Sequence, residues 1–146
     1  AEVYGSLGAA LASGADALLD MPKTVDTVAV SIGATRGTYQ AVNILRRSGG
    51  TAVTVGNDDM LRWQQQLAAK DGLYVEATSA ACVVAVEHLR GTGTIAKNDT
   101  VAELLTAGGL KDPDVTARVQ PESLVLPPDI GKAVSLLKAE GLFPNR

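Results

Sequence analysis

The amino-acid sequence predicts an α/β fold in which a mostly parallel sheet lies between flanking helices, making three layers. Short runs of β-favouring residues alternate along the chain with segments whose apolar residues recur at helical spacing. The strand-like run at 51–55 is apolar at nearly every position, as strands buried on both faces of a parallel sheet are. Strands and helices that alternate in this way favour right-handed parallel crossovers, so we expect a single α/β segment over residues 1–146.

The first half of the chain is expected to form three helices and two strands. The helices are predicted over 3–12, from Thr35 or Thr38 to Arg47, and from 57 to about 70, and the strands over 27–32 and 51–55. Glycine follows most of these segments, because it readily adopts the left-handed conformation that ends a helix. Asn57 and the two aspartates after it are expected to start the third helix, with a cap oxygen from Asn57.

The second half is expected to add two strands and two helices. The strands are predicted over 73–75 and 101–105, and the helices over 80–90 and 130–139. The helix over 80–90 is rich in alanine and valine and has few polar groups, so we expect it to be largely buried. Residues 114–128 are rich in turn formers and leave room for a short edge strand.

Composition and charge exclude several classes of function. The formal net charge is −3, so the chain has no basic surplus with which to bind nucleic acid or a membrane surface. The single cysteine, Cys82, excludes an internal disulfide, and no residues have the spacing of metal ligands. His88 is expected to be a charge near a helix end rather than part of a catalytic triad.

The hydropathy of the chain and its first residues give an expectation about its location in the cell. No apolar run reaches the roughly 18–20 residues of a membrane span. No signal peptide is visible at the start, so we expect a cytoplasmic protein. Because the chain begins at alanine, we also expect that it is cut from a longer one.

Ligands of open parallel sheets bind beyond the carboxyl ends of the strands. The candidate binding positions are therefore the segments just after the predicted strands: 33–37, 56–58, 76–79 and 106–109. The segment from Thr106 to Gly109 can form either a tight turn or a nest of backbone N–H groups for an anion. Glu76 can act in a site, or its carboxylate can simply cap the helix that follows, with Thr78 or Ser79 as N-cap.

Three segments resemble, in order and spacing, three motifs of threonine synthases: 48–60 (SGGTAVTVGNDDM), 72–81 (GLYVEATSAA) and 104–113 (LLTAGGLKDP). Those enzymes belong to the fold type II, or tryptophan synthase β-like, enzymes that depend on pyridoxal phosphate (PLP). The resemblance spans roughly residues 24–115. Ala77 stands where the family has proline, and Ala107 and Gly108 stand where it has glycine and histidine.

The resemblance implies that the chain is the C-terminal part of a larger PLP-dependent enzyme. The lysine that forms the Schiff base with PLP lies upstream in the family and has no match here, so we expect no catalytic lysine in this chain and no activity from it alone. Thr106 matches the hydroxyl that faces the pyridine nitrogen, and Glu76 matches a carboxylate near the cofactor ring. The other cofactor-binding candidates are Ala107 and Gly108, followed by Ser31, Gly33 and Ser79.

For the full-length enzyme, the resemblance implies a PLP-dependent lyase that converts O-phosphohomoserine to threonine and phosphate. A PLP-dependent threonine or serine dehydratase or ammonia-lyase is the alternative within the superfamily. A non-catalytic α/β ligand-binding module is the alternative from another class. The expected partners are a small amino-acid substrate, the missing N-terminal part of the enzyme, and further copies in a homo-oligomer; nucleic acid, membranes and metal ions are not expected.

Overall fold

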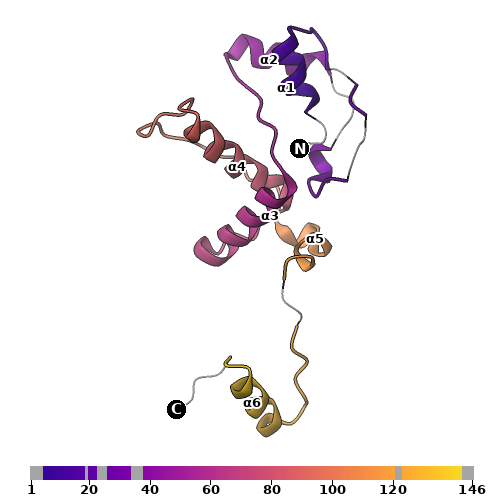
Figure 1. The fold of residues 1–146 in the computed structure, drawn as a ribbon, viewed down its shortest axis with the longest axis vertical. Helices are drawn as coiled ribbons and strands as arrows, with labels where there is room; N and C mark the ends of the chain where they lie inside the picture. The colour runs from indigo at the N-terminus through magenta and orange to yellow at the C-terminus, as the bar shows by residue number, and fades with distance from the viewer. Residues whose placement is uncertain (1–4, 19, 23–25, 34–37, 121–122, 143–146) are drawn as a thin grey trace.

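The computed structural model describes residues 5–18, 20–22, 26–33, 38–120 and 123–142. Its α-helices are α1 (Ser6–Ser13), α2 (Tyr39–Ser48), α3 (Asn57–Gln66), α4 (Ala77–Gly91), α5 (Pro113–Ala117) and α6 (Ile130–Ala139). The other regular elements of these ranges are the short 3-10 helices η2 (Val30–Ile32) and η4 (Gly109–Lys111) and the π-helical turn η3 (Leu67–Asp71). Figure 1 shows α1 and α2 at one end, α3, α4 and α5 in the middle, and α6 at the other end.

The main core lies where α3 packs against α4 (Figure 1). α3 contributes Met60, which is fully buried, and the neighbouring Leu61. α4 opposes them with the small side chains of Ala77 and Ala81, which allow the two helices to approach closely. Other segments complete the cluster with Val28, Ala29, Val55 and Val115. The predicted burial of the alanine- and valine-rich helix is confirmed for its first half, and the helix begins three residues earlier than predicted.

α3 begins at Asn57 as predicted, but Asn57 does not cap it. The side-chain Oδ1 accepts hydrogen bonds from the Val28 N–H and from the Thr27 hydroxyl, both at 3.1 Å, and Nδ2 donates to the Asp26 carbonyl at 3.2 Å. The predicted capping role is therefore wrong, because this side chain holds a segment 30 residues upstream instead. The helix continues through η3 and ends at Gly72, whose left-handed φ of 69° is a common way to close a helix, close to the predicted end.

The predicted sheet is not seen in the part of the chain that the structure describes. The one β-bridge within these ranges joins Val75 to Gly108, and its orientation is antiparallel rather than parallel. The predicted strands 51–55 and 101–105 form no ladder there, and 73–75 contributes only its bridge residue. A strand needs a neighbour with which to exchange backbone hydrogen bonds, and the described residues supply none for 51–55 and 101–105 and only a single bridge for 73–75.

Two segments expected to contain strands are partly helical. The predicted strand 27–32 is wrong, because its second half forms η2, closed by a bond from the Ile32 N–H to the Ala29 carbonyl at 3.1 Å. Pro113 opens α5 at a first-turn position, where its missing N–H costs no hydrogen bond. The short edge strand allowed for within 114–128 does not form in the described part of that segment.

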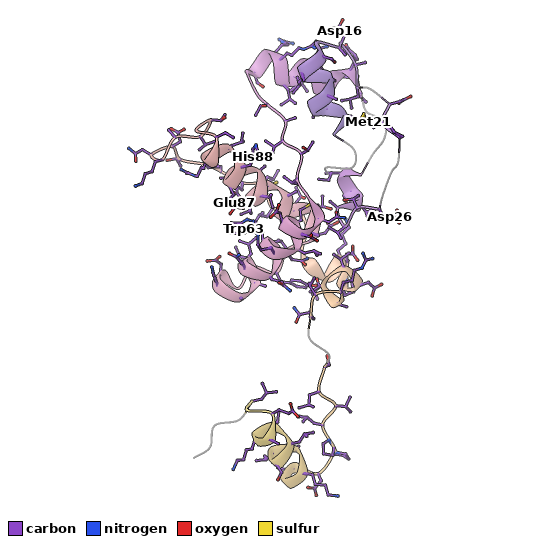
Figure 2. All side chains as sticks on the ribbon, viewed as in Figure 1. Asp16, Met21, Asp26, Trp63, Glu87 and His88 are labelled. Carbon is purple, nitrogen blue, oxygen red and sulfur yellow. The ribbon has the colours of Figure 1, made fainter. Side chains whose placement is uncertain are left out.

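α1 packs against α2 at the N-terminal end of the structure. Ala10 of α1 and Val42 of α2 are both fully buried. Arg46 of α2 reaches back to the Asp16 carboxylate at 2.9 Å and to the Ala15 carbonyl at 2.7 Å, and Figure 2 shows Asp16 just beyond α1. α1 and α2 therefore each bury a small apolar side chain where they pack together, and Arg46 adds bonds to the segment that follows α1.

The remaining helix predictions agree closely with the structure. α1 covers most of the described part of 3–12, and α2 follows Thr38, one of its two predicted starts; Thr35, the other, lies outside the described residues. α6 spans 130–139 as predicted, and the Asp129 side chain caps it by accepting a backbone N–H at 2.8 Å. None of the residues of α6 is buried. In the ranges described, no helix combines the length and the apolar character that a membrane crossing needs.

Candidate functional site

Two segments that the sequence singles out are joined through their backbones just before α4. The Glu76 N–H donates to the Ala107 carbonyl at 3.0 Å, and the Gly109 N–H donates to the Tyr74 carbonyl at 3.0 Å. These bonds flank the antiparallel bridge between the same two segments. The start of α4 and the loop that leads into η4 therefore form one platform.

A network of side chains fixes this platform to α3. Gln64, which is 1% exposed, donates through Nε2 to the Val75 carbonyl at 2.8 Å and accepts through Oε1 from the Thr116 hydroxyl at 3.2 Å. Thr116 is also hydrogen-bonded to the Tyr74 hydroxyl at 2.6 Å. The Tyr74 ring packs so closely on Gly109 that any Cβ there would overlap it. Because both polar ends of Gln64 are satisfied, the network stabilises the platform rather than weakening the core.

Glu76 carries a carboxylate that is almost completely buried, with its side chain 6% exposed. Its Oε1 accepts from the hydroxyls of Ser31 and Thr78, each at 3.2 Å. Its Oε2 is paired with the Lys111 ammonium at 3.2 Å, and that ammonium also donates to the Ser31 hydroxyl at 3.5 Å. Two hydroxyls and an opposite charge thus offset the cost of burying the carboxylate.

A second set of polar groups adjoins the first along α4. The Ser79 hydroxyl accepts from the Ala107 N–H at 3.1 Å and lies 3.3 Å from the Thr106 hydroxyl. Ser79 is 2% exposed, whereas Thr106 is exposed. A buried hydroxyl therefore supports an exposed one at the surface of the platform. We refer to the two sets together as the polar cluster, formed by Ser31, Glu76, Thr78, Ser79, Thr106 and Lys111.

The structure brings all but one of the predicted binding residues together. The residues that lie in the polar cluster or in its backbone platform are Thr106, Glu76, Ala107, Gly108, Ser31 and Ser79. Gly33 is the exception, because it follows η2 and its nearest neighbours there are the Thr27 side chain and the Val30 carbonyl. An added Cβ at Gly33 would lie 2.9 Å from the Thr27 methyl, which gives this glycine a packing role.

Lys111 lies outside the predicted binding residues, and Thr78 falls only within the candidate segment 76–79, without a predicted role in binding. Lys111 lies 35 residues from Glu76 in the sequence, and spacing gives no signal for so distant a contact. Its only signal is its place in the same motif as Thr106. The sequence offers Thr78 as a helix cap, but its hydroxyl donates to Glu76 instead. The capping alternative is wrong, because α4 starts at Ala77 with Glu76 in the N-cap position and without a side-chain cap bond.

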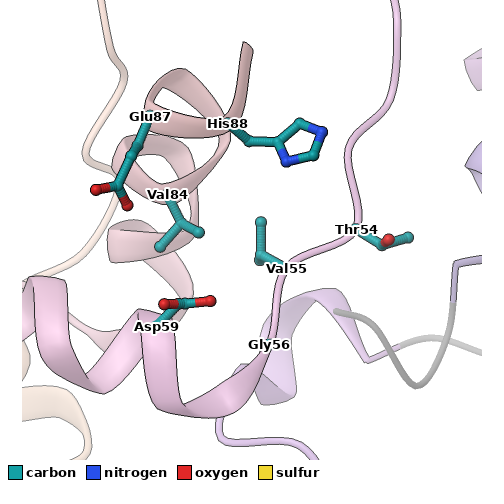
Figure 3. A pocket seen from close by; sticks show the side chains of 7 residues that line it. All are labelled: Thr54, Val55, Gly56, Asp59, Val84, Glu87 and His88. Carbon is teal, nitrogen blue, oxygen red and sulfur yellow. The ribbon is translucent and has the colours of Figure 1, made fainter. Parts of the chain in front are cut away.

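A separate hollow of about 370 Å³ lies between α4 and the start of α3, as Figure 3 shows, and is lined by Thr54, Val55, Gly56, Asp59, Val84, Glu87 and His88. Its carboxylates are already engaged. Glu87 accepts from Arg62 at 2.7 Å and from the Trp63 indole N–H at 2.8 Å, and both bonds lower the pKa of Glu87. Glu87 and then Asp59 raise the pKa of Arg62 in return.

The residues around this hollow do not form a second candidate site for catalysis or metal binding. His88 is exposed in the last turn of α4, as predicted, and Figure 2 shows it near Glu87 and Trp63. Among the described residues, no group of histidine, cysteine and carboxylate side chains could hold a metal ion. The polar cluster is therefore the better candidate, because it alone gathers residues from two of the motifs.

The chemistry that the polar cluster offers is binding and orientation. It presents hydroxyls, an ammonium group and a compensated carboxylate, and it contains neither histidine nor cysteine. Such a set can hold a polar ligand through hydrogen bonds and fix its orientation. An electron-withdrawing centre for a reaction on an amino acid would have to come from a bound cofactor.

Comparison with known proteins indicates which cofactor the family of this chain uses. The family described as pyridoxal-phosphate dependent enzyme matches residues 3–107. The threonine synthase of Methanosarcina acetivorans is 37% identical over 123 residues, which is 83% of this chain and 30% of that protein. The threonine synthase of Methanocaldococcus jannaschii is 31% identical over 117 residues, covering 80% of this chain and 29% of the relative.

A bacterial relative gives the same result. The threonine synthase of Halalkalibacterium halodurans is 32% identical over 113 residues, covering 77% of this chain and 32% of the relative. The chain thus spans about a third of the length of the relatives that it matches. The similarity to threonine synthases expected from three short motifs is confirmed over most of the chain. The chain belongs to the family of pyridoxal-phosphate dependent enzymes, which have the α/β fold of fold type II.

Proposed function

We propose that this chain forms part of the cofactor site of a threonine synthase-like enzyme, which converts O-phosphohomoserine to threonine and phosphate with PLP. One observation carries the proposal: residues of two family-like motifs meet in the polar cluster, although Ser79 and Thr106 are 27 residues apart in sequence. The relatives that match are threonine synthases, which favours this reaction over a dehydratase or ammonia-lyase. Membership of an enzyme family argues against a non-catalytic module.

The exposed side of the cluster fits a cofactor ring. The Thr106 hydroxyl is exposed and can still make a hydrogen bond beyond its contact with Ser79. Gly108 is also exposed, and a Cβ added there would come no closer than 3.9 Å to the Tyr74 carbonyl. Packing within the chain therefore does not require glycine at this position, and its small size leaves the surface open for a planar group.

The residues of the chain take distinct roles in this proposal. PLP, when bound, supplies an electron sink for the amino-acid substrate. Thr106 would meet the pyridine nitrogen with a neutral hydroxyl, and the backbone of Ala107 and Gly108 would lie beside the ring. Glu76 would stand near the ring with its charge already compensated by Lys111. The lysine that binds PLP covalently is proposed to lie outside residues 1–146, because no lysine here matches its motif.

The sheet belongs to this proposal as well. We propose that 51–55, 73–75 and 101–105 become strands of a mostly parallel sheet in the complete enzyme. The fold of the family supports this, since it supplies neighbouring strands that the described residues lack. A single domain over 1–146, association into a homo-oligomer and a cytoplasmic location are parts of the same proposal.

Substitution of Thr106 in the full-length enzyme tests the function. Thr106→Ser keeps the hydroxyl and should bind PLP as the unsubstituted enzyme does. Thr106→Val removes one hydrogen bond, for which we expect PLP to bind about 2- to 10-fold more weakly. Thr106→Asp should favour a protonated ring and change both turnover and the absorbance of the bound cofactor.

Cofactor titration, turnover with O-phosphohomoserine and absorbance spectra are the measurements. Thr92→Val is a matched control, because the bonds that the structure describes for the Thr92 hydroxyl go to the Leu89 carbonyl and to Thr94 near the end of α4, outside the polar cluster. If the valine and aspartate variants at 106 behave like this control, Thr106 does not meet the ring and the proposed site is wrong.

A further inference from the structure

The two hydrogen-bond partners of the Ser79 hydroxyl determine which bond it accepts and which it donates. It is buried in the first turn of α4, with Ser79 2% exposed. A hydroxyl has one hydrogen to donate and two lone pairs that accept. The Ala107 N–H, at 3.1 Å, can only donate, so the Ser79 oxygen must accept this bond.

The hydrogen of Ser79 then has to go to Thr106. The contact between the two hydroxyls is 3.3 Å, and either oxygen could donate if it were considered alone. Leaving the buried Ser79 hydrogen without an acceptor would cost free energy, and Thr106 is the acceptor that the structure describes within reach. The bonds therefore run in one direction, from the Ala107 N–H to Ser79 and from Ser79 to Thr106.

We propose that Ser79 is a positioning residue that makes Thr106 a hydrogen-bond donor toward the ligand of the polar cluster. Because Thr106 accepts from Ser79, its own hydrogen stays free for an acceptor on the exposed side. This inference rests on the proposed function, in which that acceptor is the pyridine nitrogen of PLP. A nitrogen without a proton can accept from Thr106, whereas a protonated nitrogen meets two competing hydrogens. Ser79 thus favours the unprotonated ring without touching it.

The charged groups near Ser79 and Thr106 do not set the protonation of the ring nitrogen in this way, because they are paired with each other. Glu76 and Lys111 are paired with each other at 3.2 Å, and Glu76 accepts in addition from Ser31 and Thr78. Ser79 and Thr106 are neutral, so their effect on the ring depends on the direction of one hydrogen bond. Removing the Ser79 hydroxyl frees Thr106 to rotate and to accept from a protonated ring nitrogen.

The experiment uses the full-length enzyme loaded with PLP that carries a ¹⁵N label at the pyridine nitrogen. In Ser79→Ala we expect the ¹⁵N resonance to move toward the protonated position at unchanged pH, and PLP to bind about 2- to 10-fold more weakly. Amide hydrogen exchange of the cofactor-free enzyme should also show faster exchange at Ala107, which loses its acceptor. Ser135→Ala in α6 is the matched control, because the bond that the structure describes for the Ser135 hydroxyl stays within its own helix, to the Gly131 carbonyl at 2.8 Å.

The outcomes separate this inference from the proposed function. If Thr106→Val moves the ¹⁵N resonance and Ser79→Ala leaves it as in the unsubstituted enzyme, Thr106 meets the ring but the positioning role of Ser79 is wrong. If neither substitution moves it, the proposed site is wrong as well. Should Ser79→Ala not fold, Ser79→Cys replaces it, because a thiol donates only weakly. An unchanged resonance in the cysteine variant then overturns the inference, and a partial shift supports it.

Discussion

α3 and α6 are both ten residues long, but α3 is packed into the core and α6 buries no residue. α3 is the more polar of the two, yet it buries Met60, Leu61 and Gln64. α6 is rich in leucine, isoleucine, valine and alanine, and it buries none of its residues. The difference shows that burial depends on the neighbours a helix finds and not on its own composition.

The two helices also differ in how they are held in place. α3 lies against α4, and through Gln64 it is joined to the backbone of the polar cluster platform. α6 has a good side-chain cap from Asp129, but a cap alone supports a ten-residue helix only marginally in water. Four predictions test whether stability is really concentrated around α3.

The largest effect should come from removing a core side chain. Met60→Ala leaves a cavity at a fully buried position, and we expect a loss of about 2–5 kcal/mol in the free energy of unfolding. Leu137→Ala in α6 changes a partly exposed leucine and should cost within about 0.5 kcal/mol. Urea unfolding of both variants measures this. A loss in Leu137→Ala as large as in Met60→Ala would show that α6 is packed after all.

The next effect concerns the close packing of Tyr74 on Gly109. Gly109→Ala places a Cβ into the ring, which cannot simply move away because its hydroxyl is bonded to Thr116. We expect a loss of about 1–3 kcal/mol in thermal or urea unfolding. Gly108→Ala is the control, because its Cβ has room, and it should cost much less. Equal losses at the two glycines would mean that the ring does not press on Gly109.

A pair of hydroxyl deletions should have effects of opposite sign. Thr116→Val removes the partner of Gln64 and Tyr74, with an expected loss of about 0.5–1.5 kcal/mol. Ser135→Ala in α6 removes a hydroxyl that bonds back to its own helix. It should raise the free energy of unfolding by up to about 0.5 kcal/mol. Calorimetry on both variants tests the pair. A gain in Thr116→Val would contradict the importance of the Gln64 network.

The smallest effect should be the pH dependence that Glu87 gives to the contact between α3 and α4. Arg62 and then Trp63 lower the pKa of Glu87 in the folded state, so the carboxylate stabilises the fold above its ordinary pKa. This contribution is lost as the pH falls through the lowered folded pKa. Glu87→Gln should therefore be less stable at neutral pH, with a difference that disappears in acid. The difference is small because both partners are solvent-exposed, and a difference that grew on acidification would be contrary to this account.

The helices could be predicted from the sequence, but the environments of their residues could not. The apolar spacing and the flanking glycines placed α2, α3 and α6 within a few residues of their observed bounds. Strand propensity in 51–55 and 101–105 gave no ladder, because pairing depends on a neighbouring strand and not on the segment itself. Asn57 has the chemistry of a helix cap, and only the fold shows that it holds residues 26–28 instead.

The candidate site could be predicted from the ends of the expected strands and from the family-like motifs. Thr106, Glu76 and Ser79 lie in segments that follow predicted strands and in motifs that resemble those of a family, and the structure brings them into adjoining sets. The position of Lys111 could not be predicted, since nothing in the local sequence indicates that it reaches Glu76. Gln64 looks like one more helix residue in the sequence, and its burial follows only from the carbonyl and the hydroxyl that surround it.

The polar cluster also bears on the order of events during folding. Arg62 and Glu87 join α3 to α4 across 25 residues of chain, whereas Lys111 and Ser31 close a loop of 80 residues. The longer closure costs about 1 kcal/mol more in chain entropy, so we expect it to follow the pairing of the two helices. Contacts that form after the folding transition state act mainly on the rate of unfolding. Weakening the Ser31–Lys111 contact should therefore shorten the lifetime of the assembled cluster while leaving the folding rate almost unchanged.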